Sequence, residues 1–135
     1  MTFLEQLKES VLFLFNKEIE RKDFVVEVGE KDGWTYRKWK SGIKECWIYY
    51  TETKTSQTWS GAGLTNANRY SFTKTLPTKF FVNPVSQIKI SGSIGNGYGF
   101  PIFVSQENSS AFSFVMTSNS SGSQLCRISI YCIGE

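Results

Sequence analysis

The side chains that enzymes most often use for acid–base and nucleophilic chemistry are scarce in this sequence. The 135 residues include no histidine, so neither an imidazole base nor a Ser–His catalytic pair can form. Glycoside hydrolysis needs two facing carboxyl groups, and only Glu45 and Glu52 lie near each other on an expected strand. Their odd separation places them on opposite faces of that strand. With Glu107 alone in an expected turn, the sequence predicts a protein that is not an enzyme.

Metal, disulfide and phosphate chemistry are not predicted either. Cys126 and Cys132 fall on one face of one expected strand, about 20 Å apart, which is beyond disulfide reach. Either could meet Cys46, but three cysteines without clustered spacing make a poor disulfide framework. We interpret all three as small buried apolar residues. The glycine-rich residues 95–99 lead into a strand and not a helix, so they are no phosphate loop. We expect neither a metal nor another cofactor.

Ligand binding has better candidates, in two loops with aromatic rings and amides but almost no carboxylates. These loops span residues 54–68 and 95–99. Sugars are held by aromatic faces together with amide and hydroxyl hydrogen bonds. The candidate ligand-binding residues in or beside the loops are Trp59, Asn66, Asn68, Arg69, Tyr70, Asn96 and Tyr98. Arg69 could also pair with an anionic group. For Tyr70 a place in the core is the stronger alternative, and Tyr98 could simply be an exposed loop tip.

Charge is distributed unevenly along the chain. Residues 1–52 hold ten carboxylates and nine Lys or Arg, whereas residues 53–135 hold two carboxylates and six Lys or Arg. The second part is rich in Ser, Thr, Asn and Gly, and it lacks the Lys and Arg density of a nucleic-acid groove. The longest apolar run, residues 11–15, is too short for a membrane span or a signal peptide. We therefore expect no nucleic-acid partner, no membrane insertion and no secretion signal.

Residues 1–22 are expected to form an N-terminal helical segment for oligomerisation or attachment. Thr2 and Glu5 make a capping box. An apolar stripe at heptad spacing follows: Leu4, Leu7, Val11 and Leu14. Two heptads cannot hold a coiled coil alone in water. The stripe must then pack either on the chain's own β domain or in a short bundle between subunits, and its width favours the bundle.

Residues 33–47 predict a β-hairpin, because aromatic and β-branched residues recur on both sides of a Ser-Gly turn dipeptide. With a two-residue loop, Lys38 opposes Glu45. With a three-residue loop that ends in a left-handed Gly42, Arg37 opposes Glu45 instead. Both registers give Glu45 a cation. We expect a structural role for the hairpin residues Trp34, Tyr36, Trp39, Glu45 and Trp47.

Residues 23–135 are expected to form one mainly β domain. Seven or eight short alternating segments with polar turns predict an antiparallel β-sandwich, or a barrel-like head, behind the short N-terminal α-helix. Strands do not alternate with helices after residue 23, which argues against a parallel α/β fold. Such a sheet leaves edges, and trimerisation is one way to cover them.

The hairpin and the last strand also carry a resemblance. The run Trp-Thr-Tyr-Arg-Lys-Trp, followed by Ser-Gly and Glu-Cys-Trp, resembles a segment of tail fibre, baseplate and receptor-binding proteins of phages that infect Gram-positive hosts. The run Ile-Ser-Ile-Tyr-Cys-Ile-Gly at residues 128–134 resembles the closing strand of the same domains. The resemblance covers Trp34–Trp47 and that last strand only.

This resemblance implies a virion protein of the phage tail, made in the bacterial cytoplasm. The implied partners are two further copies in a homotrimer, other tail or baseplate proteins, and a host cell-surface saccharide. Two alternatives stay open: a purely structural tail or baseplate module that binds no receptor, and a carbohydrate-binding module of a cell-wall enzyme.

Overall fold

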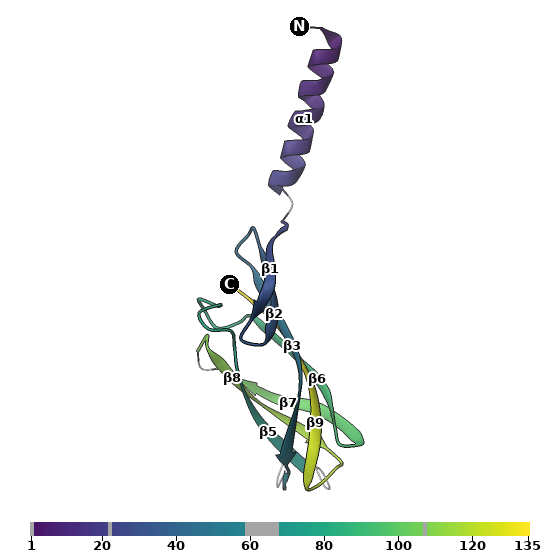
Figure 1. The fold of residues 1–135 in the computed structure, drawn as a ribbon, viewed down its shortest axis with the longest axis vertical. Coiled ribbons are helices and arrows are strands. Elements are labelled where there is room, and N and C mark those ends of the chain that lie inside the picture. Colours follow the sequence, from purple (N-terminus) through teal and green to yellow (C-terminus); the bar gives the residue numbers. More distant parts are fainter. Residues whose placement is uncertain (1, 22, 59–67, 107) are drawn as a thin grey trace.

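A computed structural model of the chain describes residues 2–21, 23–58, 68–106 and 108–135 (Figure 1). The elements within these ranges are α1 (Phe3–Arg21), β1 (Val25–Lys31), β2 (Trp34–Trp39), β3 (Lys44–Thr55), β4 (Gln57–Thr58), β5 (Asn68–Thr75), β6 (Gln87–Ile94), β7 (Gly97–Ser105), β8 (Ala111–Ser118) and β9 (Ser123–Gly134). The predicted mainly β fold with a short N-terminal helix is confirmed. There are nine described strands where seven or eight were predicted, because the short β4 lies in a segment predicted as a loop.

Helix α1 begins with the predicted capping box. The Thr2 amide donates to Glu5 Oε2 at 2.9 Å, and the Glu5 amide donates to Thr2 Oγ1 at 3.2 Å. Figure 1 shows α1 as a rod that extends away from the strands, and it packs extensively on none of the described ones. The side chains of Leu4, Leu7 and Val11 are exposed, and the side chain of Leu14 lies outside the described part of the structure. The described part of the stripe, Leu4, Leu7 and Val11, therefore does not pack on the chain's own β domain.

The strands form one antiparallel sheet in the order β1-β2-β3-β9-β6-β7-β8-β5-β4. It curls into a half-barrel, so that its two halves face each other across the core. The longest pairing joins β3 and β9, from Lys44 opposite Gly134 to Thr55 opposite Ser123. This pair runs the length of the sheet, from the end near α1 to the far end (Figure 1).

The core lies on the inner face of the curled sheet. In β9 the alternating residues Cys126, Ile128, Ile130 and Cys132 are buried, as the sequence predicted. They pack with the inward residues of the other strands, chiefly Trp34, Cys46, Tyr70, Phe72, Phe114 and Met116. All three cysteines are free and buried, which confirms their interpretation as small core residues.

The predicted hairpin is present as β2 and β3, with the three-residue loop. The Trp39 amide donates to the Ile43 carbonyl at 2.8 Å, and the Gly42 amide donates to the Trp39 carbonyl at 3.0 Å. Gly42 has φ 97°, a left-handed conformation that glycine adopts at little cost. This register places Arg37 opposite Glu45. The alternative with Lys38 opposite Glu45 is wrong, because the bulge at Gly42 shifts the pairing.

Candidate ligand-binding surface

The end of the sheet far from α1 is built from connections that bond to one another (Figure 1). The Ser56 amide donates to the Gly122 carbonyl at 3.0 Å, and the Gly122 amide donates to Ser56 Oγ at 2.8 Å. The Ser120 hydroxyl donates to the Ile94 carbonyl at 3.3 Å. These bonds join the β3–β4, β6–β7 and β8–β9 connections into one end surface.

Tyr70 belongs to the support of this end and not to its surface. Its ring is fully buried, because Tyr70 and Phe72 share the inward face of β5. Its hydroxyl donates to the Ser120 carbonyl at 2.8 Å and lies 3.3 Å from the Gly122 carbonyl. The prediction of Tyr70 as a ligand-contacting residue is wrong, since its ring has no exposed face. The alternative that placed Tyr70 in the core is the one the structure shows.

Two other predicted residues, Arg69 on β5 and Tyr98 on β7, lie on the outer face of the same end, with β8 between their strands. Arg69 lies opposite Thr117 of β8, and Thr117 lies opposite Phe100 of β7. The rings of Phe100 and Tyr98 have centroids 4.8 Å apart. Their side chains are 57% and 44% exposed, respectively. We call this outer-face region, formed by Gln57, Arg69, Tyr98 and Phe100 with the buried Thr117 between them, the distal strip.

The polar groups of the distal strip are held in place from its edge. Arg69 Nη2 donates to Gln57 Oε1 of the edge strand β4. The Thr117 hydroxyl is buried, with no hydrogen-bond partner among the described residues. None of the five strip residues carries a carboxylate. The strip therefore offers two exposed rings, one cation and the Gln57 amide, which suits a neutral or anionic ligand with apolar faces.

The remaining predicted ligand-binding residues are less closely gathered. Asn96 is exposed in the β6–β7 turn, two residues before Tyr98. Asn68 is half-buried at the start of β5, opposite Ser118. Trp59 and Asn66 lie outside the described residues. Phe100 was missed by sequence reasoning, although its spacing of two from Tyr98 places both rings on one face of a strand.

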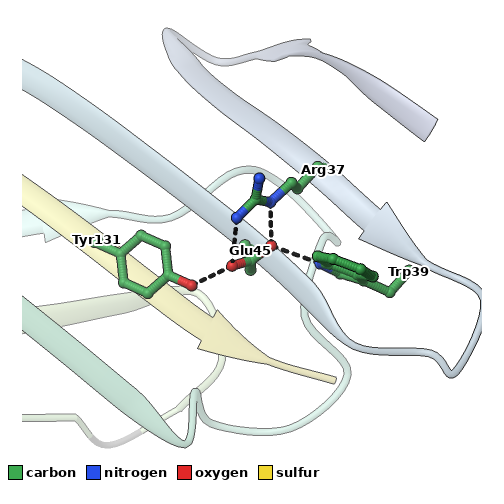
Figure 2. A network of polar contacts seen from close by, with 4 residues as sticks. All are labelled: Arg37, Trp39, Glu45 and Tyr131. Carbon is green, nitrogen blue, oxygen red and sulfur yellow. Dashed lines mark hydrogen bonds and ion pairs between the residues drawn. The ribbon is translucent and has the colours of Figure 1, made fainter. Parts of the chain in front are cut away.

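The hairpin carries a second polar cluster, shown in Figure 2, around the buried Glu45. Glu45 Oε2 accepts from Arg37 Nε and, at 2.6 Å, from Trp39 Nε1. Glu45 Oε1 accepts from Arg37 Nη2 at 3.1 Å and from the Tyr131 hydroxyl. A carboxylate has about four acceptor positions, and these donors fill them. The cluster therefore supports a structural role for Glu45 and leaves little capacity to bind a ligand.

The electrostatics of this cluster agree with its geometry. The Arg37 guanidinium hydrogen bond holds the pKa of Glu45 at about 2, below its ordinary 4.5, although burial acts in the opposite direction. Burial and the neighbouring Glu45 carboxylate raise the pKa of Tyr131 to about 12. Glu45 is thus ionised and Tyr131 protonated at neutral pH, so neither is poised to exchange a proton with a substrate.

The aromatic residues of the hairpin divide between its two faces. Trp34 is fully buried, and its indole Nε1 donates to the Thr75 carbonyl at 3.0 Å. Trp39 and Trp47 lie half-buried on the outer face. Their ring centroids are 5.4 and 5.6 Å, respectively, from the Arg37 guanidinium carbon. Tyr36 is half-buried and packs on Phe80, with ring centroids 5.1 Å apart. The hairpin contributes to the core mainly through Trp34 and Cys46.

Comparison of the chain with models of protein families, with curated proteins and with solved structures finds no match in any of the three. Within the described ranges, three or more His, Cys, Asp or Glu residues are nowhere grouped so that they could hold a metal ion. Among the same residues, no helix has both the length and the apolar content that a membrane span requires. The function must therefore be argued from the surfaces of the molecule itself.

Proposed function

We propose that the chain is a non-enzymatic protein of a phage tail, with a trimeric receptor-binding head that adheres to a host cell-surface glycan. The observation that carries this proposal is the distal strip, where two exposed rings on β7 and Arg69 on β5, with β8 between them, lie at the end of the sheet far from α1. The resemblance of the hairpin and of the closing strand to phage tail proteins supports the tail assignment.

The strip suits saccharide chemistry. The rings of Tyr98 and Phe100 can pack on the apolar face of a sugar, while the Asn96 amide can hydrogen-bond to its hydroxyls. The Arg69 guanidinium can pair with a phosphate or carboxylate substituent. A contact of this size is weak when it acts alone. Three copies on one trimer raise the overall affinity through effective concentration, without any additional contact.

The opposite end of the molecule suits assembly. Of the sixteen large apolar side chains that are exposed among the described residues, nine lie between Phe3 and Val28, in α1, β1 and the segment that joins them. Apolar surface of this extent favours burial against a partner. In the proposed particle, α1 joins the subunits or attaches them to other tail or baseplate proteins, and the strip faces the host. The location of this protein is then the virion.

The adhesive function can be tested by truncating the two exposed rings together, as Tyr98→Ala with Phe100→Ala. Tyr49→Ala is the matched control, because Tyr49 is 65% exposed on a different part of the sheet. Binding is measured on an array of Gram-positive cell-wall and capsular glycans, after melting curves show that all variants fold. We expect the double variant to lose at least tenfold in affinity and the control to bind like the parent. Equal binding by all three proteins would refute the strip as the site.

A purely structural tail module is the second candidate, favoured by the concentration of exposed apolar residues in α1 and β1. If the chain is such a module, the parent protein should assemble into an oligomer but bind no glycan on the array. A carbohydrate-binding module of a cell-wall enzyme would instead bind glycan as a monomer. Light scattering combined with the array separates these two candidates from the proposed receptor-binding trimer.

A further inference from the structure

A hollow lies at the end of the sheet nearer α1, away from the distal strip. It has a volume of about 470 Å³ and lies between the segment after β5 and the turn between β7 and β8. Its floor is apolar, with Leu76 and Phe81. Its walls carry four hydroxyls, from Thr75, Thr78, Ser109 and Ser110, and Lys79 lies among them. We call this hollow the Lys79 groove.

The walls of the Lys79 groove are fixed by bonds to several parts of the chain. The Leu76 amide donates to the Ser110 carbonyl at 2.8 Å, which ties the two walls together. The Thr78 amide donates to Asp32 Oδ2 in the β1–β2 turn at 2.7 Å. On the other side of Lys79, the Val82 amide donates to the Glu135 carbonyl at 2.9 Å. A groove held in this way loses little conformational freedom when a ligand enters it.

Lys79 itself has an unusual backbone conformation. Its φ is 56°, in the left-handed region that residues other than glycine seldom adopt. The turn is closed by the Phe80 amide, which donates to the Pro77 carbonyl at 3.2 Å, and Lys44 Nζ donates to the Phe80 carbonyl at 2.8 Å. Backbone outliers of this kind cluster at binding sites, where the surrounding structure holds them. Here the outlier carries the cation of the groove.

A smaller hollow near the groove is also lined by hydroxyl and amide groups. It has a volume of about 180 Å³ and borders the same β7–β8 turn, with Thr73, Ser105, Asn108 and Ser113 in its lining. The Thr73 and Ser113 hydroxyls are 3.2 Å apart and hydrogen-bonded. Thr73 lies two residues before Thr75 on the same face of β5, and Asn108 precedes Ser109. Hydroxyls and an amide thus run from the smaller hollow towards Lys79.

We propose that the Lys79 groove binds the phosphate ester of a sugar or of a small polyol. The wall hydroxyls can donate to and accept from ligand hydroxyls, and the Lys79 ammonium supplies a partner for one phosphate. The described residues that line the two hollows carry no carboxylate, and the nearby Asp32 carboxylate, which is not in the lining, accepts from the Thr78 amide. The larger volume falls within the usual range of small-molecule pockets. This proposal does not depend on the distal strip or on a role in a phage tail.

The test is a titration of the full chain, followed by backbone amide NMR shifts, with four probes: glucose 1-phosphate, glycerol 3-phosphate, glucose and inorganic phosphate. The key variant is Lys79→Asn, because asparagine tolerates the left-handed conformation while removing the charge. Lys89→Asn is the matched control, since Lys89 is an exposed lysine on β6, outside both hollows. Melting curves establish that both variants fold.

We expect one or both phosphate esters to shift amides of residues 75–82 and 108–110 in a saturable way. The ester that binds more tightly distinguishes a sugar from a polyol source. Lys79→Asn should weaken this binding about tenfold or more, as loss of a hydrogen bond to a charged group does, and Lys89→Asn should leave it unchanged. The double variant Tyr98→Ala with Phe100→Ala should bind these probes like the parent, so failure of the groove and failure of the strip can be told apart.

Three outcomes would overturn the proposal. The first is inorganic phosphate binding as tightly as either ester, which would mean a simple anion site. The second is equal binding by the parent and Lys79→Asn. The third is the absence of saturable shifts at these amides with either ester up to its solubility limit.

Discussion

Replacement of Glu45 by glutamine tests the buried cluster of Figure 2 with almost no change in side-chain shape. All four contacts of Glu45 come from donors, on Arg37, Trp39 and Tyr131. A glutamine amide can accept at its oxygen only. Its NH₂ group must therefore face one pair of these donors. The Tyr131 hydroxyl can rotate to accept from it, but an N–H of Arg37 or Trp39 that faces it loses its acceptor. A buried donor without an acceptor is destabilising.

The size of the effect follows from the pKa of Glu45. A fall from 4.5 to about 2 corresponds to about 3.4 kcal/mol, because one pKa unit corresponds to about 1.36 kcal/mol. This figure is an upper bound, since the Arg37 side chain is 40% exposed and solvent screens the pair. We expect Glu45→Gln to lower the free energy of unfolding by about 1–2 kcal/mol at pH 7.

The assay is urea denaturation of the parent and the variant between pH 7 and pH 2. The folded-state pKa of Glu45 is depressed, so its stabilisation is fully present above the unfolded pKa near 4.5 and is lost as the pH falls towards about 2. The stability difference between the two proteins should therefore be constant from pH 7 to about 5 and shrink below that. Glu52→Gln is the control, because Glu52 and Lys54 form an ion pair in which both side chains keep over a third of their surface in contact with solvent. Its effect should stay below about 0.5 kcal/mol. A Glu45→Gln variant as stable as the parent at pH 7, or a difference that does not change with pH, would refute the reasoning.

Four further predictions concern the core and the helix. Trp34→Ala should cost about 3–5 kcal/mol in urea melts because the ring is fully buried, and Trp47→Ala, at a half-buried ring, should cost clearly less. Gly92→Ala should abolish folding or strongly lower the melting temperature, since the new Cβ would lie 2.1 Å from a backbone oxygen of β9. The three cysteines should resist a thiol reagent in the folded protein and all react in urea, because all are buried; fast labelling without urea would contradict their burial. Leu7→Asp with Val11→Asp should dissociate the proposed trimer in light scattering, by placing charges in an apolar seam, and a monomeric parent protein would refute that seam.

Much of the fold could be predicted from local sequence signals. Two features depend only on residues a few positions apart in the sequence, and both appear in the structure as expected. They are the capping box at Thr2 and Glu5 and the alternating burial in β9. The hairpin register depended on one backbone angle, at Gly42, and the sequence left it open between two choices. Alternation defines two faces of a strand but does not say which of them is covered. Trp39 and Trp47 therefore proved to be half-buried on the outer face, beside Arg37.

The candidate site was harder to predict than the fold. Arg69 and Tyr98 were each selected for their chemistry, but their proximity depends on the strand order β7-β8-β5, which is set by non-local pairing. For the same reason the intervening Thr117 could not be identified. Tyr70 was selected although it is not on the surface. Its side chain suits a ligand, but its position in the alternation of β5 faces the core. The left-handed turn at Lys79 gave no sequence signal, because lysine rarely adopts it.

The position of the Glu45 cluster suggests how the two ends of the molecule are kept in a fixed relation. The cluster joins β2, β3 and β9 near α1, and the β3–β9 pairing then continues from Glu45 to Thr55 towards the far end, a span of about 33 Å at 3.3 Å per residue. Tyr98 and Phe100 lie on β7, a strand that contributes no residue to the cluster. The changes in free energy caused by substitutions at well-separated sites are usually additive. Glu45→Gln should therefore lower stability without changing affinity at the distal strip, whereas loss of the Tyr98 and Phe100 rings should lower affinity with little effect on the pH dependence of unfolding.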